Sequence, residues 1–193
     1  MVRTDLTEVV SVHIRSFSGF FLSKMGPRFL RCLYEEILND PSGIALVCRH
    51  GLIVRGFVAG TTEPRGFYRR LMARRWVRFA LASFVPVLKH PQIAPRLLDA
   101  FRKTQEQPDY KGLGLLMSIA VDPELQHGGV GTALVQAFLT ECRKRGLASV
   151  HLTTDLSGNA RVNRFYSKMG FTVSRIVTTG QGRVMNDYRI ELQ

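Results

Sequence analysis

A glycine-rich loop that leads into a helix is the sharpest chemical signal in the sequence. Residues 126–132 read Gln-His-Gly-Gly-Val-Gly-Thr and follow the apolar run 115–121 after a turn that contains proline. The first N–H groups of a helix are free and the helix dipole is positive there, so the loop predicts an anion site suited to a diphosphate. The spacing Gly128-Gly129-x-Gly131 fits neither a Walker loop nor a dinucleotide fingerprint.

A second segment with candidate chemistry is residues 159–171. Asn159 precedes Tyr166 by seven residues, about two helical turns, so both side chains lie near one face of a predicted helix. The same helix carries an apolar stripe at helical spacing. From this segment alone, Tyr166 is either a functional phenol or a half-buried core tyrosine, and the pattern leaves both interpretations open.

Taken together, the two segments resemble the GNAT superfamily of acyl-CoA-dependent N-acyltransferases. The pattern Gln126-x-x-Gly129-x-Gly131 resembles the pyrophosphate loop of that family, and residues 159–171 resemble its second CoA-contact segment. The motifs themselves cover only residues 120–132 and 159–171. The order of the flanking elements extends the resemblance to most of the chain outside residues 63–111.

The resemblance implies that acetyl-CoA is the cosubstrate and that an amine attacks its thioester directly. Tyr166 corresponds to the general acid of the family, which protonates the departing thiolate. The implied cofactor contacts come from the end of one strand, from the glycine loop and from the second segment: Ile119, Ala120, Val121, Gln126, His127, Gly128, Gly129, Val130, Gly131, Thr132, Asn159 and Tyr166.

The general base is less clearly marked than the general acid. The strand 115–121 carries Ser118 as its only polar side chain, where many members of the family place a carboxylate or a histidine. Glu63, at the end of the preceding strand, is the best carboxylate by position, and Asp155 and His151 on the neighbouring strand are alternatives. A water relay, or an amine that is already neutral, would remove the need for a side-chain base.

The elements that position these residues follow from apolar periodicity, turns and caps. We predict helices at 6–17 and 26–39, a hairpin of 44–49 and 52–61, a helical block at 64–111, a strand at 115–121, a helix at 132–145, a strand at 148–154, a helix at 159–169 and a hairpin of 171–177 and 184–192. The fold class is α/β (α+β), a mixed and mostly antiparallel sheet flanked by helices. The resemblance implies that the sheet splays between its two central parallel strands. We treat residues 1–193 as a single domain that contains a helical insert at 64–111.

The charge of the chain is concentrated in that insert. Lys and Arg total 27 against 15 Asp and Glu, a net charge of +12, and residues 64–111 hold eleven of the basic residues and three of the acidic ones. Three interpretations stay open for the insert: a solvated face, a wall that binds an anionic acceptor, or a contact with an anionic membrane surface. A homodimer contact is compatible with all three.

Composition and motifs argue against several classes of function. The three cysteines form no CxxC pair, so we expect buried thiols and no metal site. We expect no nucleic-acid partner, because no stacking or recognition motif accompanies the arginines. The longest apolar run, 76–88, is too short to span a membrane, and the N-terminus is not a secretory signal, so we expect a cytoplasmic protein, with a peripheral membrane contact as the alternative.

The acceptor that we expect is a primary amine of a small molecule, an amino sugar or a nucleotide-linked compound. Two alternatives remain open. One is acetylation of a protein N-terminus or lysine. The other is a non-catalytic domain that keeps CoA binding.

Overall fold

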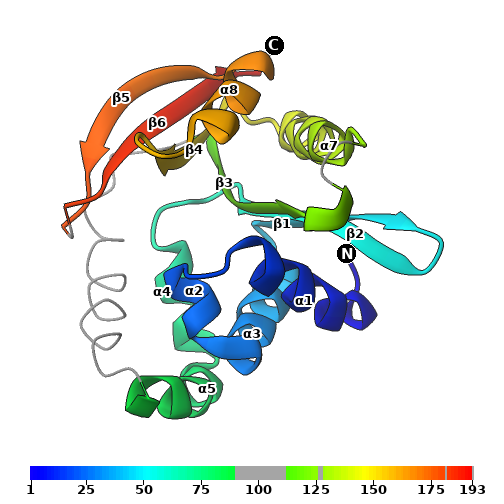
Figure 1. Cartoon of the computed structure of the whole chain (residues 1–193), viewed down its shortest axis with the longest axis vertical. Helices are drawn as coiled ribbons and strands as arrows, with labels where there is room; N and C mark the ends of the chain where they lie inside the picture. The colour runs from blue at the N-terminus through cyan, green and yellow to red at the C-terminus, as the bar shows by residue number, and fades with distance from the viewer. Residues whose placement is uncertain (90–111, 126–127, 181, 193) are drawn as a thin grey trace.

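A six-stranded sheet with helices on both faces forms the centre of the molecule (Figure 1). The computed structural model describes residues 1–89, 112–125, 128–180 and 182–192. The strands are β1 (Gly43–His50), β2 (Ile53–Thr61), β3 (Leu113–Val121), β4 (Ser149–Asp155), β5 (Thr172–Thr178) and β6 (Val184–Glu191), in the order β1-β2-β3-β4-β6-β5. All neighbouring strands are antiparallel except β3 and β4. This confirms the predicted mixed, mostly antiparallel sheet.

The helices form two layers. One face carries α1 (Leu6–Ser16), α2 (Phe21–Lys24), α3 (Gly26–Asn39), α4 (Phe67–Arg74) and α5 (Trp76–Lys89), and the other carries α7 (Val130–Lys144) and α8 (Ala160–Lys168) (Figure 1). Short 3-10 helices occupy Arg3–Asp5 and Pro123–Leu125. A separate apolar core fills the space between the sheet and each layer.

Helix α7 illustrates how the sequence pattern becomes packing. Its apolar residues recur every three or four positions, and the resulting stripe is buried against β1, β2 and β3: Leu134, Val135, Phe138, Leu139 and Cys142. The expectation of burial is wrong for the other two cysteines. Cys32 and Cys48 are only half-buried, because they lie at the edge of the α3 stripe and on the edge strand β1.

The two central parallel strands separate, which confirms the expected splay. Backbone pairing between β3 and β4 is confined to three residue pairs and ends at Leu115 and His151, although β3 continues to Val121 and β4 to Asp155. A bulge on the other edge of β3 leaves Met117 without a partner on β2. Bulges increase the local twist of a strand, so this one contributes to the divergence of β3 from β4.

The described part of the insert is helical, as predicted, and it packs on α3. Phe79 of α5 meets Phe29 of α3 with ring centroids 5.4 Å apart. Residues 69–78 hold five clustered arginines, Arg69, Arg70, Arg74, Arg75 and Arg78. Four of them pair with acidic side chains, three of which come from α3 or the residue that follows it: Arg70–Glu63 at 3.4 Å, Arg74–Asp40 at 3.1 Å, Arg75–Glu36 at 3.6 Å and Arg78–Glu35 at 3.1 Å. These ion pairs favour a structural role for four of the five clustered arginines. The rest of the predicted block, 90–111, lies outside the described residues.

Candidate active site

A cleft of about 710 Å³ opens where β3 and β4 separate. Its walls come from these two strands, the start of α7, helix α8, the β5–β6 hairpin and the residues that follow α1. Most of the predicted cofactor contacts that the structure describes line it: Ile119, Ala120, Val121, Gly129, Gly131, Thr132, Asn159 and Tyr166. Gly128 and Val130 do not line it, and Gln126 and His127 lie outside the described residues.

The glycine loop presents uncapped backbone amides to this cleft. Gly129 is the N-cap of α7 with φ +72°, a left-handed conformation that favours glycine, and it has no side chain with which to cap the helix. A Cβ on Gly131 would lie 3.6 Å from the Phe165 ring and 3.7 Å from Val121, so the loop packs directly on β3 and α8. Free N–H groups at the positive end of a fifteen-residue helix fit an anion such as a diphosphate.

Three cations that the sequence reasoning did not single out lie on α8, the helix whose Phe165 packs on the loop. Arg161, Arg164 and Lys168 follow one another at helical spacing on α8 and, with Phe165, line a hollow of about 340 Å³. Arg161 also lines the cleft. The signal available in the sequence was the spacing of these basic residues, three and four positions apart on one helix. Together they give that helix a positively charged face.

Tyr166 is both a packed tyrosine and a cleft residue. Its side chain is 5% exposed, and its ring meets those of Phe165 and Phe171 at 5.2 and 5.6 Å. It nevertheless lines the cleft. Burial raises the pKa of its phenol, so the hydroxyl remains protonated at neutral pH. A neutral phenol that borders the cleft can act as a proton donor.

Asn163 fixes the helix that carries Tyr166. Thr154 donates to its Oδ1 at 2.5 Å, and its Nδ2 donates to the carbonyl of Asp155 at 3.0 Å. Both partners belong to the end of β4. These bonds tie α8 to the splayed end of the sheet, so Asn163 positions Tyr166 although sequence reasoning did not assign it a role.

The candidate general bases lie in three different environments. The Glu63 side chain is 69% exposed, pairs with Arg70 and is not among the cleft-lining residues. His151 is buried with Nδ1 3.5 Å from Asp187 and does not line the cleft either. Asp155 does line the cleft, where Arg183 holds both of its carboxylate oxygens at 2.7 Å.

A chain of buried polar groups reaches the cleft from the opposite helix layer. Tyr34 of α3 donates its hydroxyl to Ser118 Oγ at 3.2 Å, and His13 Nδ1 of α1 lies 2.6 Å from the same hydroxyl. Ser118 lines the cleft. Sequence reasoning noted Ser118 as the only polar side chain of its strand, and it gave neither Tyr34 nor His13 a role. The signal available in the sequence was one polar group within the otherwise apolar face of each helix: the hydroxyl of Tyr34 and the ring nitrogen of His13.

His13 should make the stability of the fold depend on pH. It is 2% exposed, and burial lowers its pKa from 6.5 to about 4. Between these values the unfolded chain binds a proton that the folded chain does not, so the free energy of unfolding should fall as the pH falls, by about 1.4 kcal/mol per pH unit. Urea denaturation from pH 7 to pH 4 measures this slope. The variant His13→Gln should lose that contribution, whereas exposed His50→Gln should keep it; equal slopes in all three proteins would contradict the assignment.

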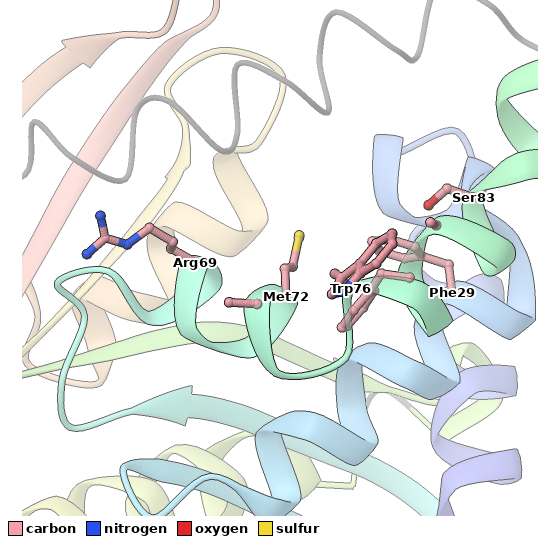
Figure 2. Close-up of a pocket in the computed structure, with 8 residues that line it drawn as sticks. Phe29, Arg69, Met72, Trp76 and Ser83 are labelled. Carbon is pink, nitrogen blue, oxygen red and sulfur yellow. The ribbon is translucent and has the colours of Figure 1, made fainter.

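A second, apolar cavity of about 390 Å³ lies among α3, α4 and α5 (Figure 2). Phe29, Trp76 and Arg69 are among the residues that line it, and Figure 2 shows the Arg69 side chain at the opposite end of the lining from Phe29 and Trp76. The outer side of α5 is also apolar, with exposed large side chains at Trp76, Val77, Leu81, Phe84, Val85 and Leu88. Within the described residues, no helix has the length and apolar character needed to cross a membrane.

Comparisons with known proteins agree with the geometry of the first cleft. Residues 98–171 match the sequence model described as the Acetyltransferase (GNAT) family. A mycothiol acetyltransferase of Streptosporangium roseum is 43% identical over 63 residues, which are 33% of this chain and 18% of that protein. A ribosomal protein bS18 alanine N-acetyltransferase of Escherichia coli is 39% identical over 61 residues, 32% of this chain and 40% of that protein. The matches thus span less than half of either relative.

The fold agrees over a longer stretch. A GNAT-family protein of Desulfovibrio desulfuricans superposes with a TM-score of 0.66 at 18% sequence identity, covering all of this chain and 95% of the other. The family match lies on the cleft-forming part of the chain, and the structural match extends to the whole sheet and both helix layers. Residues 98–171 therefore match the GNAT acetyltransferase family in sequence, and the whole chain shares the fold of a GNAT-family protein.

Proposed function

We propose that this protein transfers the acetyl group of acetyl-CoA to the primary amine of a small molecule or an amino sugar. The observation that carries the proposal is the cleft itself, in which the uncapped start of α7 and the phenol of Tyr166 border the gap between β3 and β4. When bound, acetyl-CoA would supply the thioester whose carbonyl an amine attacks directly. The amides after Gly129 would hold its diphosphate, with Arg161, Arg164 and Lys168 adding positive charge nearby.

In this proposal backbone and side-chain groups of the cleft each have a defined task. The backbone of Ile119 and Val121 would bind the pantetheine arm in sheet-like fashion, because β4 no longer pairs with this part of β3. Tyr166 would give its proton to the thiolate as the carbon–sulfur bond breaks. The amine would lose its proton to Asp155 if the acceptor is confined to the cleft, or to Glu63 if the acceptor extends to the end of β2.

The acceptor side of the cleft supports a compound with an apolar face. Phe17 and Phe20 line it from the residues after α1, and the Arg183 guanidinium lies 5.9 Å from the centre of the Phe20 ring. Aromatic walls of this kind suit a sugar ring or an aliphatic chain. Because Asp155 already pairs with Arg183, this cation provides little free charge for an anionic acceptor.

The arginines at 69–78 then contribute less to anion binding than their number indicates. With Arg70, Arg74, Arg75 and Arg78 paired, binding of an anionic acceptor or membrane surface by this group would depend on Arg69, which has no ion pair among the described residues, and on the exposed apolar side of α5. A solvated, structural role for the paired arginines is the simpler interpretation. Binding to anionic vesicles tests the alternative of a membrane contact.

A panel of amines tests the proposed function. The purified chain, with acetyl-CoA, should release CoA in the presence of glucosamine or a nucleotide-linked amino sugar, and the acetylated amine should be found by mass spectrometry. An alanyl peptide and a lysyl peptide represent the protein acceptors, and sedimentation with vesicles of an anionic phospholipid tests surface binding. Preferred acetylation of the alanyl peptide would show that the acceptor is a protein N-terminus and not a small molecule. CoA binding without acetylation of any amine would overturn the enzymatic proposal.

A further inference from the structure

The buried hydrogen-bonded row of His13, Tyr34 and Ser118 has no role in the proposed steps of acetyl transfer. Ser118 lies on β3 beyond the last residue that pairs with β4, and it lines the cleft. Its partner Tyr34 belongs to α3, so the Ser118 side chain faces the helix layer of α1 and α3. Ser16, Phe17 and Phe20 line the cleft from the same layer, which places Ser118 on the proposed acceptor side.

The position of Ser118 along its strand fits the reacting end of the cofactor. Gly131 of the proposed diphosphate loop lies against Val121. Ser118 is three residues back from Val121, about 10 Å along a strand, and directly precedes Ile119, the first proposed contact of the pantetheine arm. A group at this place is near the thioester end of the cleft and away from the phosphates.

The hydrogen bonds fix which way the Ser118 hydroxyl is used. Tyr34 donates to one lone pair of Ser118 Oγ, so the serine keeps its own O–H and a second lone pair for the cleft. Because the Tyr34 proton is used in this way, the neutral His13 ring must donate Nδ1–H to the tyrosine oxygen at 2.6 Å. Its Nε2 then carries no proton, which agrees with a buried Nε2 that has no hydrogen-bond partner among the described residues.

We propose that Ser118 Oγ accepts a hydrogen bond from the N–H of the acceptor amine, and that Tyr34 and His13 are positioning residues that hold the serine for this contact. The assignment rests on the proposed function. Tyr34 is 1% exposed and His13 is 2% exposed, so both are fixed by the core on which they pack. No proton is transferred along the chain in this assignment. The amine keeps its lone pair for attack because it binds Ser118 through a hydrogen.

Steady-state kinetics with glucosamine and with an alanyl peptide test the assignment. Ser118→Ala and Tyr34→Phe should each lower kcat/KM for the amine by roughly three- to tenfold, the value of one hydrogen bond, and leave the KM for acetyl-CoA unchanged. The double variant should be no slower than Ser118→Ala, because Tyr34 acts through the serine. Ser118→Thr, which keeps a hydroxyl, should restore most of the rate.

Tyr188→Phe is the matched control. Tyr188 is a buried tyrosine that is not among the cleft-lining residues, and its hydroxyl donates to the Asn163 carbonyl at 3.4 Å. It removes the same group as Tyr34→Phe and should leave the kinetics unchanged. An active wild type with an equally active Ser118→Ala would overturn this assignment alone, as would additive losses in the double variant. A wild type that turns over neither amine would overturn the proposed function, and this assignment with it.

Discussion

Replacing Tyr166 by phenylalanine should leave acetyl-CoA binding intact and slow the chemical step by roughly 10²–10⁴-fold, the usual contribution of a general acid. The ring packs between Phe165 and Phe171, and phenylalanine fills the same space. Only the hydroxyl that borders the cleft is lost. Single-turnover mixing of enzyme-bound acetyl-CoA with excess amine measures the step directly, without interference from product release.

The pH profile gives this prediction a second readout. Because burial raises the pKa of the Tyr166 phenol, the acid should stay protonated at every pH below the ordinary tyrosine value of about 10. The wild-type chemical step should therefore show no alkaline loss below that pH. Tyr188→Phe, the loss of a buried phenol outside the cleft lining, is again the control. A Tyr166→Phe enzyme that reacts at the wild-type rate would make Tyr166 a packing residue only.

Gly129→Val should abolish the stabilisation of the protein by CoA. A ligand at one hundred times its Kd stabilises the folded state by about 2.7 kcal/mol, which raises Tm by roughly 5–10 °C for a domain of this size. A β-branched residue is strained at φ +72°, and its side chain would stand before the free amides of α7. Differential scanning fluorimetry with and without CoA measures the shift.

The chain offers a closely matched control for backbone strain. Gly146, just beyond the other end of α7, has the same φ of +72°, and a Cβ on either glycine would meet no atom within 4 Å. Gly146→Val should therefore lower Tm by a similar amount without ligand, yet keep the full shift with CoA. A normal CoA shift in Gly129→Val would remove the loop from the cofactor site, and a lost shift in both variants would assign the effect to strain.

Local sequence patterns determined much of the fold and the cofactor half of the site. The 3.6-residue period of the apolar residues in α7 marks the face that is buried, and the glycine loop at its start predicted a helix N-terminus with free amides. The turns and the order of elements predicted the hairpins and the parallel central strands. These features depend on the conformational preferences of neighbouring residues and on which side of an element is apolar, and both can be read over a short window.

Only the tertiary structure decided which distant side chains meet. The sequence left open whether the arginines at 69–78 are free or paired, and the structure shows that α3 and the residue after it place Glu35, Glu36 and Asp40 beside three of them. The contact between Tyr34 and Ser118 joins residues 84 apart, and Glu63 proved to pair with Arg70 instead of lining the cleft. Such contacts depend on how whole helices dock on the sheet. An apolar stripe predicts which face of a helix is buried. It does not predict which polar side chain of another element will lie next to that face, because this depends on how the helix docks.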